Sequence, residues 1–130
     1  MTEEIQLPDE DGIEYKVVQV YVGQEETPVM RVAPLSEKSH MKILLELLKD
    51  YSIKAVPEVI GSQYLVPVQS FVQGKEYNAI GMGKCKKIDN RVYFYGFSTD
   101  YEMRIDGDHL KKIEPSLYSP LELIVGEPPK

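Results

Sequence analysis

The stretch 77–97 constrains the fold most, because it is typical of a long β-hairpin. Asp89 and Asn90 separate two runs of residues that suit β-strands, and both residue types tolerate the positive φ angles of a tight hairpin turn. If Ile88 pairs with Arg91, every other cross-strand pair follows, since the two strands of an antiparallel hairpin run past each other residue by residue.

That register predicts pairing as far as Gly81 and Ser98, and it gives the hairpin two unlike faces. The members of the first face are small or apolar: Ala79, Gly81, Gly83, Cys85, Phe94 and Gly96. The second face and the region of the turn carry lysine, tyrosine and arginine: Lys84, Lys86, Lys87, Arg91, Tyr93 and Tyr95. Glycines in a strand let another segment approach closely or let the sheet bend sharply, so we expect the helix near 41–51 to pack on the first face.

One long segment, 37–51, has the apolar period of a helix, with Ser36 or Ser39 as its N-cap. Its apolar side chains cover an arc of about 200°, whereas a surface helix usually needs little more than about 100°. Two alternatives explain this excess. Either the helix lies in the concave face of a strongly curved sheet, or Ile43 and Leu47 complete their burial against another subunit or partner. The second alternative predicts a homodimer with these two residues near its interface.

The sequence predicts an α+β fold, in which a mainly antiparallel, strongly bent β-sheet packs on one major helix. The C-terminal half is expected to form a small-barrel-like meander, which resembles SH3-like small barrels in the order of its elements. Residues 108–113 form either a short helix or a last strand, and we expect one helical turn followed by a short closing strand. We assign 1–11 to an acidic disordered leader, 12–114 to a single domain and 115–130 to a tail with one short strand.

The net charge of −6 is concentrated at the N-terminus, where residues 1–14 hold six acidic residues and no basic one. This acidic leader is either a mobile terminus or a segment that covers a basic surface of its own chain or of a partner. The single cysteine excludes an internal disulfide and favours a reducing compartment. No apolar run approaches the ~18 residues of a membrane span, and the first residues lack the basic start and apolar core of a secretory signal. We therefore predict a cytoplasmic protein that binds no membrane.

Residue counts also bear on the source. Only two asparagines and one cysteine stand beside 14 glutamates and 12 lysines, a balance that favours a thermophilic organism.

The residues that usually carry chemistry form no convincing set. His40 and His109 are the only histidines, and neither lies near other ligands at a spacing typical of metal sites. Asp106, Asp108 and His109 fall short of a calcium-loop pattern, so we interpret them as a turn with helix capping. Cys85, on the small face of the hairpin, is interpreted as a buried small hydrophobe rather than a nucleophile. The sequence thus predicts no metal, no cofactor and no catalytic residue.

The Lys/Tyr face, defined here as Lys84, Lys86, Tyr93 and Tyr95, allows two interpretations. Cations beside aromatic rings on a sheet can bind single-stranded nucleic acid through base stacking and phosphate contacts. The same pattern is typical of a solvated sheet with cross-strand cation–π pairs, and the overall acidity counts against nucleic acid. We predict a non-catalytic binding or interaction module whose partner is a protein or single-stranded nucleic acid. A structural homo-oligomeric subunit is the alternative, and an enzyme is the least favoured class.

Overall fold

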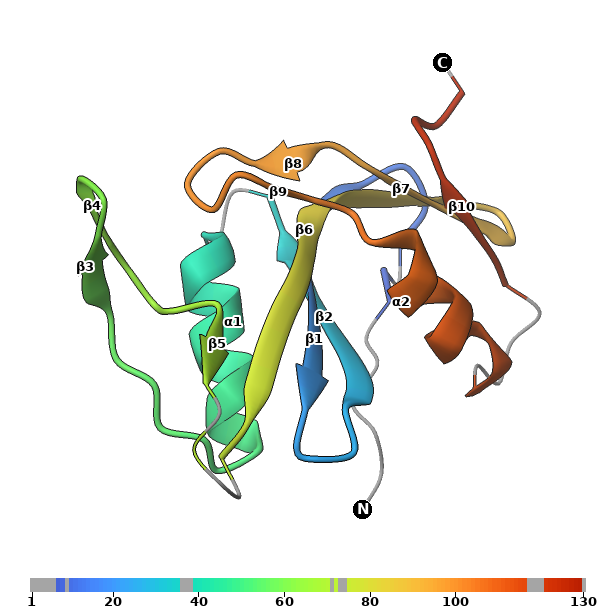
Figure 1. Cartoon of the computed structure of the whole chain (residues 1–130). Coiled ribbons are helices and arrows are strands. Elements are labelled where there is room, and N and C mark those ends of the chain that lie inside the picture. The colour runs from blue at the N-terminus through green and yellow to red at the C-terminus, as the bar shows by residue number, and fades with distance from the viewer. Residues whose placement is uncertain are drawn as a thin grey trace.

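A mixed, mostly antiparallel sheet and two helices make up the fold in this computed structural model, which confirms the predicted α+β class (Figure 1). The structure describes residues 7–8, 10–35, 39–70, 72, 75–116 and 121–129. The main sheet contains β1 Glu14–Val22, β2 Thr27–Pro34, β5 Gln69–Ser70, β6 Tyr77–Ile88, β7 Arg91–Tyr95 and β10 Glu122–Val125. Two separate pairs of short strands are β3 Glu58–Ile60 with β4 Gln63–Leu65, and β8 Phe97–Ser98 with β9 Met103–Arg104. The helices are α1 His40–Asp50 and α2 Gly107–Ile113, and a 3₁₀ turn, Glu114–Ser116, follows α2.

The main sheet is open. Its strands follow the order β10-β7-β6-β1-β2, and β5 pairs with β6. Only β10 and β7 run parallel, while the other neighbours in this sheet are antiparallel. Among the described residues β2 and β10 stand at opposite ends of this order, so the small-barrel-like closure of the C-terminal half is not confirmed.

The hairpin register is confirmed near the turn and fails farther from it. Five pairs form as predicted, from Ile88 with Arg91 to Lys84 with Tyr95. The pairing then ends, because Gly96 adopts a φ of +75° and turns the chain away from β6. Ser98 therefore pairs with Met103 of β9 instead of Gly81. A glycine can adopt this left-handed conformation at no steric cost, and this freedom is what ends β7.

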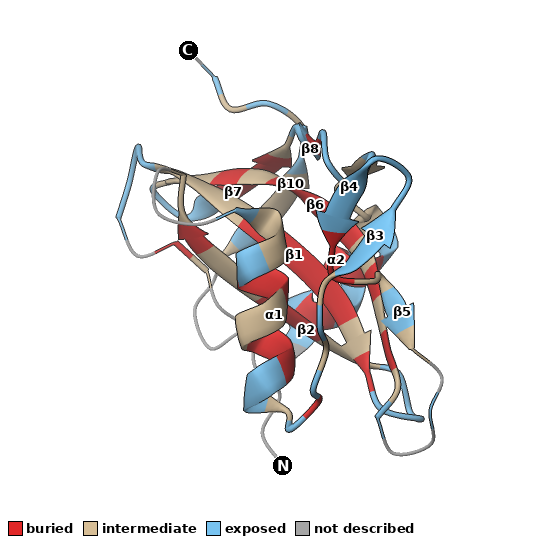
Figure 2. Cartoon of the chain, turned by 90° about the vertical axis from the view of Figure 1, so that its left-hand side faces the viewer, coloured by how far each residue is buried: buried red, intermediate tan, exposed pale blue. Residues whose placement is uncertain are grey.

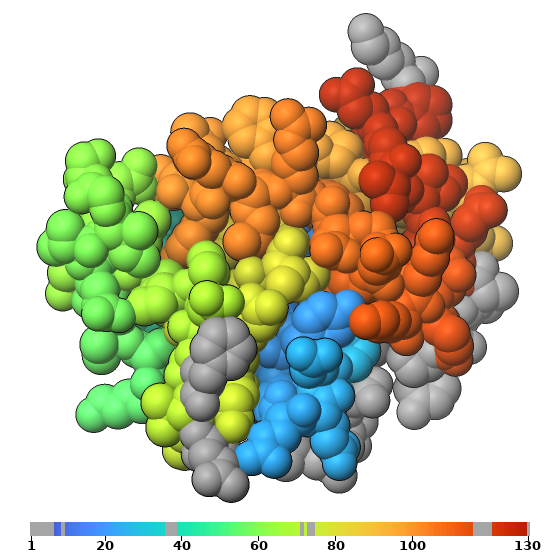
Figure 3. All heavy atoms as spheres, viewed as in Figure 1, coloured from blue at the N-terminus to red at the C-terminus, as the bar shows by residue number. Residues whose placement is uncertain are grey.

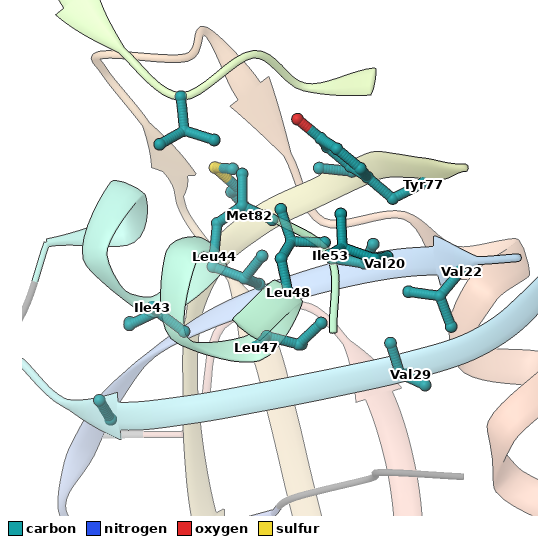
Figure 4. Packing of buried hydrophobic residues seen from close by; sticks show 14 residues of the cluster. Val20, Val22, Val29, Ile43, Leu44, Leu47, Leu48, Ile53, Tyr77 and Met82 are labelled. Carbon is teal, nitrogen blue, oxygen red and sulfur yellow. The ribbon is translucent and has the colours of Figure 1, made fainter. Parts of the chain in front are cut away.

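Helix α1 is capped by Ser39, whose hydroxyl accepts a hydrogen bond from the backbone N–H of Lys42. Ser36, the other candidate for the cap, lies outside the described residues. The helix packs on one face of the sheet, where valines of β1 and β2 meet its leucines (Figure 4). The same core cluster includes residues from later in the chain, among them Ile53, Val66 and Met103.

The two α1 residues singled out for an interface are buried. Ile43 is 1% exposed and Leu47 is fully buried within the single chain. Both side chains are covered within the chain, in a cluster to which β1, β2 and residues after the helix contribute. The two side chains leave no apolar area at the surface for a second copy, so the argument for a dimer through them loses its basis.

The glycines of β6 allow a close approach, but the expected partner was wrong. β1 and β6 fall out of step between Gln19 and Val20, so that Ile80 is an extra residue on β6. The bulge places Ala79 with Met82 in the core cluster under α1, while Gly81 and Gly83 face the other side of the sheet. A Cβ at Gly81 would lie 2.0 Å from Gln19 Oε1, and one at Gly83 would lie 2.9 Å from the Ile105 side chain. The segment that leads into α2 covers these glycines, rather than α1.

The second face of the sheet holds its own core cluster, in which Val17, Cys85 and Phe94 pack against Leu110 and Ile113 of α2. Since Val17 and Val18 belong to different clusters, β1 is buried on both faces. Residues 107–113 form a helix, so the expectation of one helical turn and a closing strand was wrong. The carboxylate of Asp106, the N-cap residue directly before the helix, accepts from the His109 N–H and starts the helix there.

Residues near both ends of the chain pack on the side of the sheet that α2 covers. The strand predicted in the tail forms as β10 and lies parallel to β7 at the edge of the main sheet. At the other end, Leu7 packs against the cluster under α2, and Asp11 bridges to Lys87. Residues 1–6 and Asp9 of the predicted leader lie outside the described residues.

Candidate functional site

The Lys/Tyr face forms as the register predicts. β6 and β7 bring Lys84 opposite Tyr95 and Lys86 opposite Tyr93. β1 adds two residues that the sequence alone did not bring here, because Lys16 pairs with Lys84 and Glu14 pairs with Lys86. The face therefore combines three lysines with a carboxylate.

Of the two tyrosines, Tyr93 is poorly placed to stack on bases, and Tyr95 is tied to the sheet through its hydroxyl. Tyr93 is only 8% exposed, so little of its ring is open to a ligand. The Tyr95 hydroxyl donates to the Glu14 carboxylate, and burial together with this bond raises the pKa of Tyr95. Base stacking needs an accessible ring face, which Tyr93 does not offer.

Carboxylates also accompany the cations near the hairpin turn. Lys87 lies on the opposite face of β6, and its Nζ is 2.6 Å from Asp11 Oδ1. The Lys87 ammonium lowers the pKa of the Asp11 carboxyl, which also accepts the Asp89 N–H. The Nε of Arg91 is 3.2 Å from Glu122 Oε1, and a hydrogen bond to Tyr93 raises the pKa of Arg91. These partners reduce the positive potential that a phosphate backbone would meet.

His109 belongs to a buried polar cluster that joins β1 to the start of α2. Its Nδ1 is 3.2 Å from Gln19 Nε2 and its Nε2 is 3.2 Å from the Val20 carbonyl oxygen. The Gln19 amide also binds both backbone groups of Asp106, donating to its oxygen at 3.0 Å and accepting from its N–H at 2.8 Å. Burial lowers the pKa of His109, so the ring is neutral, with Nε2–H donating to Val20 and Nδ1 accepting from Gln19. Both ring nitrogens are occupied by the fold, and neither faces a ligand.

The remaining candidates for chemistry are equally occupied. Cys85 is buried, and burial raises the pKa of its thiol, which removes the thiolate that a nucleophile needs. Nε2 of His40 is bound to the Gly83 carbonyl oxygen at 2.9 Å, and burial lowers the pKa of this histidine as well. Over the ranges that the structure describes, no group of three or more metal-ligating side chains occurs.

The exposed apolar side chains are concentrated in one region that sequence reasoning missed. Eight large hydrophobic residues of the described chain are exposed, and five of them fall between positions 56 and 72: Val56, Val59, Ile60, Tyr64 and Val72. Three of these lie on the β3–β4 hairpin, here called the arm, which stands apart from the main sheet (Figure 1 and Figure 2). Val59 and Tyr64 face each other across it and are 75% and 64% exposed.

A groove of about 370 Å³ lies between the base of the arm and β5. One wall is the segment 53–58, and the other is formed by Pro67, Gln69, Ser70 and Val72. The arm and the start of β5 occupy one side of the molecular surface (Figure 3). Pro57 and Pro67 lack the backbone donor of a strand, which is typical of the edge of a sheet, but no pattern in this stretch predicted that the arm would be uncovered.

Three further observations bear on the class of protein. Within the described ranges, no helix has both the length and the apolarity needed to cross a membrane. No protein-family model matches the chain. A comparison with curated proteins finds no match either. The functional argument therefore depends on the surface of this chain alone.

Proposed function

We propose that this chain is a non-catalytic protein-interaction module and that its partner docks on the arm. The observation that carries the proposal is the exposure of Val59 and Tyr64, side by side on a hairpin that no other strand of the described chain covers. Apolar side chains gathered on a surface are typical of interaction sites, whereas single exposed hydrophobic residues are ordinary. The absence of a free acid–base pair or nucleophile among the described residues favours binding over catalysis.

Single-stranded nucleic acid is the weaker candidate. The Lys/Tyr face offers Lys16, Lys84 and Lys86 but sets Glu14 among them, and its two tyrosines are largely committed to the fold. A protein partner suits the exposed apolar arm better, because an aliphatic and an aromatic side chain bury area without needing a charged ligand.

The test compares two variants with matched chemistry. The double variant Val59→Ser with Tyr64→Ser removes the apolar pair of the arm, while Val125→Ser removes an apolar side chain of similar exposure, 60%, from β10. A partner captured from the source organism is purified and titrated by calorimetry against the wild-type chain and both variants. We expect the arm variant to bind at least about tenfold more weakly and Val125→Ser to bind within about twofold of wild type.

A partner that binds the wild type and the arm variant equally would refute the proposal. Sedimentation at micromolar concentration tests whether the partner is a second copy of this chain. If the wild-type chain forms a dimer that the arm variant loses, the partner is a second copy, and the chain is the homo-oligomeric subunit of the alternative interpretation.

A further inference from the structure

Beside the arm, β5 presents a backbone edge that no strand of the described chain occupies. β5 pairs only with β6, through Gln69 with Asn78 and Ser70 with Tyr77. The Ala79 N–H donates to the Val68 carbonyl oxygen at 2.6 Å, which makes Gln69 and Asn78 the non-hydrogen-bonded pair of this ladder. The N–H and C=O groups of Gln69 therefore point away from β6, toward the outer edge.

This edge borders the groove of about 370 Å³. The side chains that line the groove from both walls are mainly apolar: Ile53, Ala55, Val56, Pro67, Val72 and Tyr77. An extended chain that pairs with Gln69 would direct alternate side chains to opposite faces, so that one set meets these apolar walls.

The charges around the groove favour an acidic occupant. Lys54 and Lys75 line it together with one carboxylate, Glu58. Lys75 Nζ donates to the Ser52 carbonyl oxygen at 2.7 Å, which uses one of its three protons and holds the ammonium at the rim. With two cations against one anion, a partner segment that carries Asp or Glu is complementary to this rim.

We propose that the groove binds an extended peptide segment of the partner protein, in which apolar residues alternate with acidic ones, and that this segment adds to β5 as a further strand. The inference rests on the proposed function, because it names how and with what chemistry the partner is held. Main-chain hydrogen bonds to Gln69 supply affinity, and the apolar walls with the two lysines select the side chains.

The probe is a random twelve-residue peptide library displayed on phage and selected against the wild-type chain. We expect enrichment of peptides in which apolar residues alternate with Asp or Glu. A synthetic peptide from the enriched set is then titrated by fluorescence anisotropy, and its position is read from chemical-shift changes of the Gln69 and Ser70 amides.

A matched pair of variants isolates the strand addition. Gln69→Pro removes the outward N–H without touching the ladder to β6, so the fold should tolerate it as an edge proline. Gln69→Ala deletes the same side chain and keeps the N–H. We expect Gln69→Pro to weaken peptide binding about tenfold and Gln69→Ala to change it less than about twofold. Equal affinities for these two variants would overturn the proposal, as would a selection that enriches no peptide.

A second pair tests the charge preference. Lys54→Glu should weaken binding several-fold at low salt and less at high salt, whereas Lys42→Glu, on the exposed surface of α1, should not change it. If the arm variant loses the captured partner while Gln69→Pro keeps it, the interaction module stands and strand addition fails. A selected peptide whose shifts lie away from β5 likewise contradicts the site.

Discussion

Replacing Gly81 by alanine is the sharpest test of how this fold is held together. The new Cβ would lie 2.0 Å from Gln19 Oε1, closer than real Cβ atoms come, and 3.0 Å from the Asp106 nitrogen, which is tighter than most real contacts. Gln19 cannot move aside freely, because it is fully buried and its amide binds Asp106 and His109. The substitution therefore forces the start of α2 away from β6 or breaks the Gln19 hydrogen bonds.

The magnitude follows from three contributions. Overpacking a tight interior costs about 1–3 kcal/mol. A buried donor or acceptor that loses its partner costs about 1–3 kcal/mol more. The lower backbone entropy of alanine in the unfolded chain offsets about 0.4–1 kcal/mol of this loss. We expect Gly81→Ala to lower the free energy of unfolding by roughly 2–4 kcal/mol, a large fraction of the stability of an ordinary domain.

Urea denaturation measures this loss, with Gly107→Ala as the control. Gly107 begins α2, and a Cβ there would meet only a Val125 methyl group at an ordinary 3.7 Å. The control should be neutral or slightly stabilising, since alanine favours a helix over glycine. Adding Gln19→Ala to Gly81→Ala should relieve the clash, so the double variant should lose less stability than the sum of the single ones. A loss below about 1 kcal/mol for Gly81→Ala, or strict additivity of the pair, would refute the reasoning.

Three further predictions concern the buried groups and the state of assembly. Burial lowers the pKa of His109 below its ordinary value of 6.5 in the folded chain. As the pH drops through 6.5, the imidazole is therefore protonated in the unfolded chain before it is protonated in the folded one. The free energy of unfolding should fall over this range, down to the pKa of the folded state. Denaturation curves at pH 7.5 and 5.5 check the direction, and no decrease would contradict the neutral ring. Because burial raises the pKa of Cys85, a thiol reagent at pH 8 should react slowly with the native chain and rapidly in urea; equal rates would show an accessible thiol. Leu47 is covered within the chain, so Leu47→Ala should not change the state of assembly. If light scattering at micromolar concentration gives the wild type a mass near 14.8 kDa, the variant should have the same mass. A different mass for the variant would indicate that Leu47 contributes to an interface between subunits.

Local chemistry explains which parts of the fold were predictable from the sequence. The turn at Asp89 and Asn90 fixes the register over the first five pairs, because each pair follows from its neighbour. The period of α1 and the capping of α2 are likewise properties of short stretches. The Lys/Tyr face could be predicted for the same reason, since a register determines which side chains share a face.

The surface of highest interest could not be predicted in this way. Val59 and Tyr64 lie opposite each other on β3 and β4, and their apolar character does not say whether a second layer covers them. The groove beside Pro67 lies between segment 53–58 and β5, and no pattern within either stretch says that they leave space between them.

By itself the sequence determined the elements that depend on neighbouring residues: the hairpin turn, the helix 40–50, the strand at 122–125 and the buried character of Cys85. The tertiary structure alone decided what lies over each face. A single extra residue on β6, Ile80, moved Ala79 to the side of α1 and left Gly81 and Gly83 on the side of α2, and one positive φ at Gly96 ended β7. Segments distant in sequence then covered α1 and left the arm exposed. Such outcomes depend on contacts between segments far apart in the chain, whose free energies no local pattern of residues contains.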